Sequence, residues 1–205
     1  MLQVSNTTWP SLVAAIAGVL IGDGPLGAAQ IWASTCPPGA GSKVGVSVAL
    51  GVLRQAELIE TIQDPFQRTQ DPFQGPQDPF QRTQGPFQGI QEPLWRWSNP
   101  TALSSPPAQG EVTRQLAYLL GKLGNTPIDA RAASIAIGHP TRSTTEDRAL
   151  RALVHQGLSQ LVTLGLATIC RSPTNATPRY QTAPCLVDRW VTRREKALSS
   201  TGRRS

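Results

Sequence analysis

The chain has 205 residues with a net charge of +6, and 39% of its residues are apolar. The 18 glycines and 18 prolines mean that much of it is turn or irregular structure, and the apolar fraction is enough for small cores but low for one large core. The first apolar run, residues 11–21, is shorter than the roughly 20 residues that a membrane-spanning helix needs.

The positive charge is concentrated in the last 95 residues. Residues 1–62 carry two basic and three acidic side chains, and residues 63–110 carry three and four. Residues 111–205 carry fourteen basic and six acidic side chains, a net charge of +8. Such a field attracts polyanions, either nucleic acid or an anionic membrane surface. A solvated arginine-rich face is the alternative reading.

Cysteine and histidine are sparse, and their spacing predicts no metal site. Cys36, Cys170 and Cys185 occur in no CxxC pair, and the two histidines are too far apart for a zinc finger. Three cysteines fit a reducing compartment with buried, inert thiols. Residues 1–6 lack the basic start of a signal peptide. We therefore expect a soluble, cytoplasmic protein with no metal, cofactor or membrane partner.

The first 62 residues predict three helices and a strand. The apolar residues Leu12, Ile16, Val19 and Leu20 fall on one face of a helix over about 10–21. A break at 22–25 separates it from a second helix over about 25–34. A third helix is expected over about 42–57, followed by a strand at 59–62.

Residues 63–90 repeat a seven-residue unit four times, beginning with Gln-Asp-Pro-Phe-Gln-Arg-Thr, and a degenerate fifth copy follows at 91–97. The proline in each unit blocks regular helix and interior strand. One large apolar residue per unit offsets too little of the entropy cost of ordering the segment. We expect an insertion at the tip of a hairpin, in which residues 94–98 pair antiparallel with 59–63. Residues 99–110 would then be a linker.

The last part of the chain predicts the same order of elements. Apolar residues spaced for one helical face give a helix over about 111–123, and Pro127 suits the first turn of a second over about 127–137. Ser143 with Glu146 is a capping-box pattern that starts a third helix over about 144–164. A hairpin over 166–182 follows, and residues 191–205 are interpreted as a basic tail.

The two parts align with one another in sequence. Residues 22–25 match 124–127, and residues 59–62 match 166–169. The sequence therefore predicts an α+β fold, mainly α with small β-hairpins, built from two similar modules. These are an N-terminal module at 1–98 with its insertion at 63–90, and a C-terminal module at 111–190.

Three helices followed by a hairpin, joined by the Leu-Gly-Leu-type turn within 161–169, resemble the winged helix-turn-helix family. The resemblance covers about 111–190, and the internal alignment extends it to a tandem. It implies that the third helix enters the major groove of DNA and that the wing touches the backbone or the minor groove. The first turn of that helix also carries Glu146 and Asp147. Their negative charges would repel DNA unless these residues only cap the helix. The implied DNA-contacting residues are Arg142, Thr144, Thr145, Arg148 and Arg151 around the third helix, and Arg171, Asn175 and Arg179 in the wing. Arg193 and Arg194 in the basic tail would add sequence-independent affinity for phosphates, and a merely solvated end is an equal alternative.

No catalytic motif is present: the sequence has no Walker A loop, no HExxH and no nucleophile elbow, so we expect no enzyme. Two functions remain open. One is a double-stranded-DNA-binding regulator, or a plasmid- or phage-type replication or partition factor, located at the nucleoid. The other is a non-catalytic protein-interaction scaffold, as in the tandem winged-helix subunits of chromosome-condensing complexes. Val44, Val46 and Val48 would then let the N-terminal module bind a partner or a second subunit, although plain core packing explains them equally well.

Overall fold

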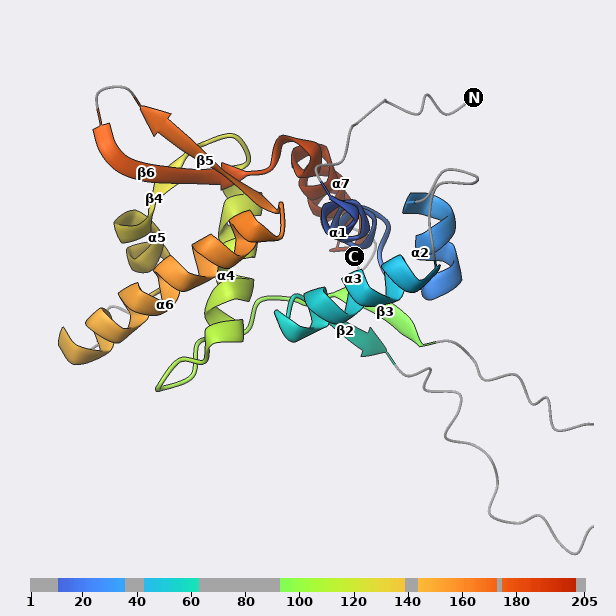
Figure 1. Cartoon of the computed structure of the whole chain (residues 1–205), viewed down its shortest axis with the longest axis horizontal. Helices are drawn as coiled ribbons and strands as arrows, with labels where there is room; N and C mark the ends of the chain where they lie inside the picture. Colours follow the sequence, from blue (N-terminus) through green and yellow to red (C-terminus); the bar gives the residue numbers. More distant parts are fainter. Residues whose placement is uncertain (1–10, 36–42, 63–92, 139–143, 173–174, 202–205) are drawn as a thin grey trace, which may run out of the picture.

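The computed structural model describes residues 11–35, 43–62, 93–138, 144–172 and 175–201, with the backbone alone at 171–172, 175–176 and 200–201. The described chain is mainly helical and has two three-stranded antiparallel sheets (Figure 1). The α+β prediction is confirmed at this level. Within the described ranges, no helix is both long and apolar enough to cross a membrane.

The first half of the fold consists of three helices and a three-stranded antiparallel sheet. The strand order in this sheet is β1-β3-β2. The helices agree with the predicted ranges to within about three residues. The predicted pairing of 94–98 with 59–63 is confirmed, because Ile59 lies opposite Trp97 and Ile62 opposite Leu94. The second predicted helix begins later than expected, since residues 26–27 form a short strand. The elements are α1 (Leu12–Asp23), β1 (Leu26–Gly27), α2 (Ala28–Thr35), α3 (Lys43–Gln55), β2 (Ile59–Ile62) and β3 (Leu94–Trp97).

The second half repeats this order element by element. Its sheet order is β4-β6-β5, and Ile128 pairs with Tyr180 as Leu26 pairs with Trp95. Both α2 and α5 have eight residues, and both follow a two-residue strand. The elements are α4 (Gln109–Leu123), β4 (Ile128–Asp129), α5 (Ala130–Ile137), α6 (Thr144–Thr163), β5 (Ala167–Ser172) and β6 (Asn175–Thr182).

The turn from the third helix into the hairpin is the same in both halves. The amide of Leu58 donates to the carbonyl of Leu53, and that of Leu166 donates to the carbonyl of Leu161. Glu57 at φ 57° therefore takes the place of Gly165 at φ 73°. The sequence alignment of 59–62 with 166–169 was wrong by one residue, because a glutamate occupies the left-handed position that glycine marks in the second half.

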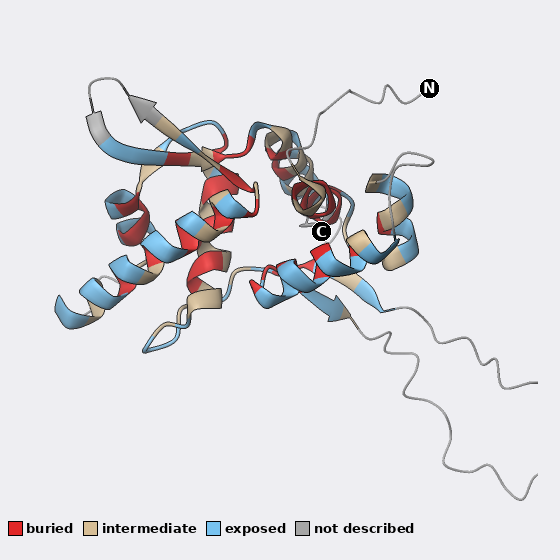
Figure 2. Ribbon diagram, in the orientation of Figure 1, coloured by how far each residue is buried: buried red, intermediate tan, exposed pale blue. Residues whose placement is uncertain are grey.

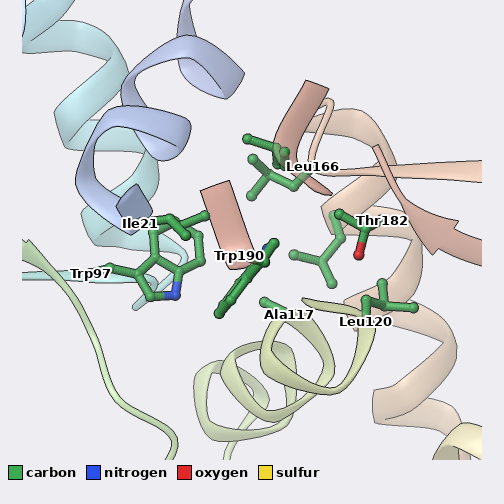
Figure 3. A pocket seen from close by; sticks show the side chains of 9 residues that line it. Ile21, Trp97, Ala117, Leu120, Leu166, Thr182 and Trp190 are labelled. Atoms are coloured by element: carbon green, nitrogen blue, oxygen red, sulfur yellow. The ribbon is translucent and has the colours of Figure 1, made fainter. Parts of the chain in front are cut away.

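A last helix, α7 (Pro184–Thr201), joins the two halves. The prediction of a tail from residue 191 was wrong as far as Thr201. Trp190 of this helix is 4% exposed, and its ring meets those of Trp97 and Tyr118 edge-on at centroid distances of 6.0 and 6.1 Å. Figure 3 shows Trp190 between Trp97 of the first half and Ala117 of the second, beside a cavity of about 10 Å³. The buried side chains of both halves therefore form one continuous core.

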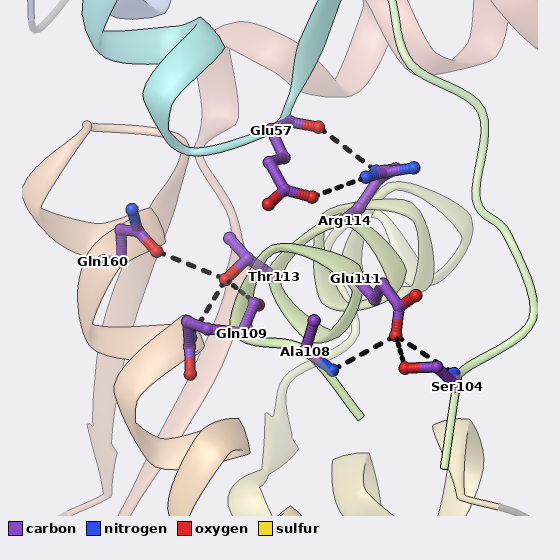
Figure 4. A network of polar contacts seen from close by, with 8 residues as sticks. All are labelled: Glu57, Ser104, Ala108, Gln109, Glu111, Thr113, Arg114 and Gln160. Carbon is purple, nitrogen blue, oxygen red and sulfur yellow. Dashed lines mark hydrogen bonds and ion pairs between the residues drawn. The ribbon is translucent and has the colours of Figure 1, made fainter. Parts of the chain in front are cut away.

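Polar contacts also connect the halves. Arg114 of α4 donates to the carboxylate of Glu57 at 2.9 Å and to its carbonyl at 3.1 Å (Figure 4). Because these bonds hold both the side chain and the backbone carbonyl of Glu57 in place, they favour its left-handed backbone conformation. On the other side, Lys196 of α7 donates to the carbonyl of Gly22 at 2.5 Å.

Candidate nucleic-acid interface

Helix α6 is positioned by a face of buried apolar residues. Leu150, Val154, Leu158 and Leu161 are all at most 2% exposed and follow helical spacing. Gly157 lies on the same side, and a methyl group there would come within 2.9 Å of Leu116 of α4. The glycine therefore allows α4 and α6 to lie close together, which fixes the direction in which the opposite face of α6 points.

The opposite face of α6 is exposed and polar, and it carries the two arginines predicted from the sequence. Thr144 and Thr145 lie exposed at the helix start, and Arg148 and Arg151 follow on the next turns. Within the described residues, neither arginine forms an ion pair. Figure 2 shows this end of α6 as exposed, on the side away from the first half. Both cations are thus available to an external anion.

Two acidic residues share the first turn of α6. Glu146 accepts a hydrogen bond from Ser105 Oγ at 3.2 Å, so its carboxylate is engaged by the loop before α4. Asp147 is half-exposed. The predicted capping role of Glu146 pairs it with Ser143, which lies outside the described residues, as does Arg142.

In Figure 1 the hairpin β5–β6 lies along the top of the second half and the start of α6 at its lower left, with α5 between them, and both point away from the first half. Arg179 is exposed on β6, opposite Cys170 of β5. Arg171 and Asn175 lie in these two strands, where only their backbone is described. The hairpin and the start of α6 thus both extend from the second half in the direction away from the first half.

Arg193 and Arg194 lie elsewhere, on α7. Arg193 donates to Asn99 Oδ1 at 2.7 Å, and its guanidinium carbon lies 5.9 Å from the centroid of the Trp190 ring. Burial lowers the pKa of Arg193. Arg194 donates to the carbonyls of Trp190 and Lys122 at 3.4 and 3.5 Å. The expectation that these two arginines sit on a basic tail was wrong, because both lie on α7 and contact the folded body.

Helix α3 is the counterpart of α6, and its outer face differs in chemistry. Val44, Val48 and Val52 are 69, 61 and 37% exposed and form a stripe along this face. Val46 is 2% exposed, so for this residue the core reading is correct. If the two helices are aligned at their shared C-terminal turn, Val48 corresponds to Gln156 of α6. The first turns of α6, with Arg148, have no counterpart in the described part of α3.

Two exposed polar residues of the second half lie near the predicted DNA-contacting residues, but the sequence reasoning did not select them. Arg131 lies on α5 next to α6, and Gln156 lies on α6 two turns after Arg148. Helical spacing from Arg148 would have found Gln156, since the two lie on one face. Arg131 had no sequence signal beyond its charge.

The described residues offer little other chemistry. They contain no group of three or more histidine, cysteine or acidic residues that could hold a metal ion. Cys170 and Cys185 are free thiols that are half-buried, which corrects the expectation of full burial, and Cys36 lies outside the described residues. Desolvation raises the pKa of the Cys185 thiol, so it is a weak nucleophile.

Comparisons of the chain with family models, with curated proteins and with solved structures found no match in any of the three.

Proposed function

We propose that each half is a winged-helix module and that the second half binds double-stranded DNA. The order helix, strand, helix, helix, strand, strand, with the short first strand beside the last, supports the winged-helix reading of both halves. The functional proposal rests on the exposed arginines of α6, which form no ion pair with any residue that the structure describes. An α-helix is about as wide as the major groove of B-DNA, so α6 can enter it.

In this arrangement, the residues of α6 have different tasks. Arg148 and Arg151 donate to guanine edges or to phosphates, for which the planar guanidinium is suited. Thr144 and Thr145, at the helix start, donate to the backbone of the DNA. Arg179 on the hairpin meets a phosphate or the minor groove. Arg193 contributes less to DNA binding than the α6 arginines, since Asn99 and the Trp190 ring already engage its side chain.

The test is a binding titration of the full chain with duplex DNA at several salt concentrations, read by fluorescence anisotropy. The full chain is required because α7 gives both halves a common core. We expect binding near 50 mM salt that weakens steeply towards 200 mM, since neutralised phosphates release counterions. Arg148→Ala and Arg151→Ala should each weaken binding, by about 1–3 kcal/mol where the arginine reads a base.

Arg54→Ala and Arg193→Ala are the matched controls. Arg54 is an exposed cation at the end of α3, so its loss tests whether any surface charge matters. Arg193→Ala removes a partly buried cation that is engaged by Asn99 and by the Trp190 ring. Both should bind DNA almost as the unchanged protein does. If binding is absent near 50 mM salt, or if it survives the loss of Arg148 and Arg151 together, the proposal is wrong.

The second candidate is a non-catalytic protein-interaction scaffold. The stripe of exposed valines on α3 favours it, because exposed apolar surface on a helix marks contact sites more often than a polar face does. The same titration separates the two functions. A chain that does not bind DNA but whose self-association or partner binding is lost in Val48→Glu would be a scaffold.

A further inference from the structure

A second site lies on the first half, between α2 and α3. Here the helices leave a cavity of about 130 Å³, lined by Ala28, Ala29, Trp32, Lys43, Val46 and Ser47. Alanine and valine side chains give it apolar walls, and Trp32 adds a flat aromatic wall. Lys43 is the one charged residue of this lining, with its Nζ 6.0 Å from the centroid of the Trp32 ring. The cavity therefore suits a ligand that carries an apolar ring and a carboxylate.

The size of the cavity matches one phenyl ring. An apolar protein cavity of about 150 Å³ is large enough to bind benzene. A phenylalanine side chain can therefore enter the space between α2 and α3.

The sequence supplies such a ligand next to the cavity. Leu94 pairs with Gly27, and the next residue, Ala28, lines the cavity. The described chain that follows residues 63–92 therefore begins close to the cavity wall. Asp-Pro-Phe occurs in three of their four regular units, at 64–66, 71–73 and 78–80, whereas the fourth has Gly-Pro-Phe.

The spacing within Asp-Pro-Phe fits the spacing within the cavity. The proline fixes φ at about −65° and holds the unit close to polyproline II, in which two residues on either side of one residue stand about 6 Å apart along the chain. This is close to the 6.0 Å between Lys43 Nζ and the Trp32 ring. A phenylalanine against Trp32 would therefore place the preceding aspartate near Lys43.

We propose that this cavity binds an Asp-Pro-Phe unit of the same chain, with the phenylalanine ring beside Trp32 and the aspartate paired with Lys43. The unit comes from the same molecule because a short tether gives an effective concentration of the order of millimolar, far above that of a second copy in dilute solution. Three equivalent units raise this concentration further. The site is independent of α6 and of DNA binding.

The first experiment uses the full chain labelled with 5-fluorotryptophan, and observes the fluorine resonance of Trp32, assigned with Trp32→Phe. The comparison is a variant in which the four repeat phenylalanines, Phe66, Phe73, Phe80 and Phe87, are replaced by alanine. We expect the Trp32 resonance to shift while those of Trp97 and Trp190 stay in place. The shift should not depend on protein concentration. An unchanged Trp32 resonance would overturn the proposal, and a shift that grows with protein concentration would assign the site to a second copy instead.

The second experiment adds peptides to the variant without repeat phenylalanines. Gln-Asp-Pro-Phe-Gln-Arg-Thr should move the Trp32 resonance back towards its original position. The matched peptide with asparagine in place of aspartate should bind about two- to fivefold more weakly, the range expected for one exposed ion pair. Lys43→Gln should remove this difference. Equal binding of the two peptides to the protein that retains Lys43 would contradict the proposed pairing.

Discussion

Gly121 of α4 lies against the ring of Trp190 of α7. A methyl group at this position would stand 2.3 Å from the indole ring, far inside van der Waals contact. We expect Gly121→Ala to lower the free energy of unfolding by about 1–3 kcal/mol, measured by urea denaturation with tryptophan fluorescence. Gly51→Ala on α3 is the control, since nothing lies within 4 Å of its added methyl group. That variant should be more stable by about 1 kcal/mol, because alanine favours helix. Equal destabilisation by both would contradict this account of Gly121.

Glu111 stabilises the start of α4 through its charge. Ser104 Oγ, the Ser104 amide and the Ala108 amide donate to Oε2 at 2.7, 3.0 and 3.2 Å (Figure 4). These hydrogen bonds hold the pKa of Glu111 below its usual value of 4.5. Alanine at position 108 has no side-chain acceptor, so Glu111 supplies only one half of a capping box.

The lowered pKa of Glu111 predicts how stability depends on pH. Its ionised form is favoured by folding, so its contribution is complete above about pH 4.5 and is lost as the pH falls through the lowered pKa of the folded state. The difference in free energy of unfolding between the unchanged protein and Glu111→Gln should therefore shrink on acidification. Chemical denaturation at a series of pH values measures it. A difference that grows below pH 4.5 would show that the carboxylate is not held in this way.

At the scale of elements, the β2–β3 hairpin does not depend on the length of the insertion between its strands. The pairing of Ile59 with Trp97 and Ile62 with Leu94 is complete within residues 59–62 and 94–97. Deleting three units, residues 70–90, leaves one Asp-Pro-Phe unit in place and should therefore change the free energy of unfolding by only about 1 kcal/mol, because loop-closure entropy varies slowly with length. Thermal and urea unfolding measure this change. A loss of several kcal/mol would mean that the repeat contributes to the core.

The elements that the sequence predicted well are those with a strong local pattern. The core face of α6, with Leu150 and Leu158, repeats at helical spacing, and so does that of α4. The strands β2 and β3 were found because the internal alignment suggested a partner for residues 94–98. The two-residue strands β1 and β4 were not predicted, because each is recognisable as a strand only from its pairing with a strand that is distant in the sequence.

Helix α7 was missed for a different reason. Its buried anchors are few, chiefly Leu186 and Trp190, and a run of charged residues follows them. Such a pattern is typical of a solvated tail, because the burial of Trp190 depends on two surfaces that are far apart in the sequence. For the candidate interface, the exposure of Arg148 and Arg151 followed from their helical position. The engagement of Arg193 by Asn99 could not be predicted, since it requires the loop after β3 to meet α7.

At the scale of the whole molecule, Trp190 links the stabilities of the two halves. Its ring contacts Trp97 on one side and Tyr118 on the other. We expect Trp190→Ala to cost about 3–5 kcal/mol, as for other buried aromatic residues. Hydrogen exchange should then accelerate in both α1 and α4, because both lose their common neighbour. Val191→Ala, at a half-exposed position on the same helix, is the control and should have little effect. Faster exchange in one half alone would show that the halves are independent.

The position of α7 also has a consequence for the newly made chain. Every surface that α7 covers, on α1 as on α4, precedes it in the sequence and leaves the ribosome earlier. Until residues 184–201 emerge, Ile21 and Trp97 face solvent together with the apolar side of α4. During synthesis this apolar surface is accessible to chaperones and to other nascent chains. It becomes buried when α7 packs onto it.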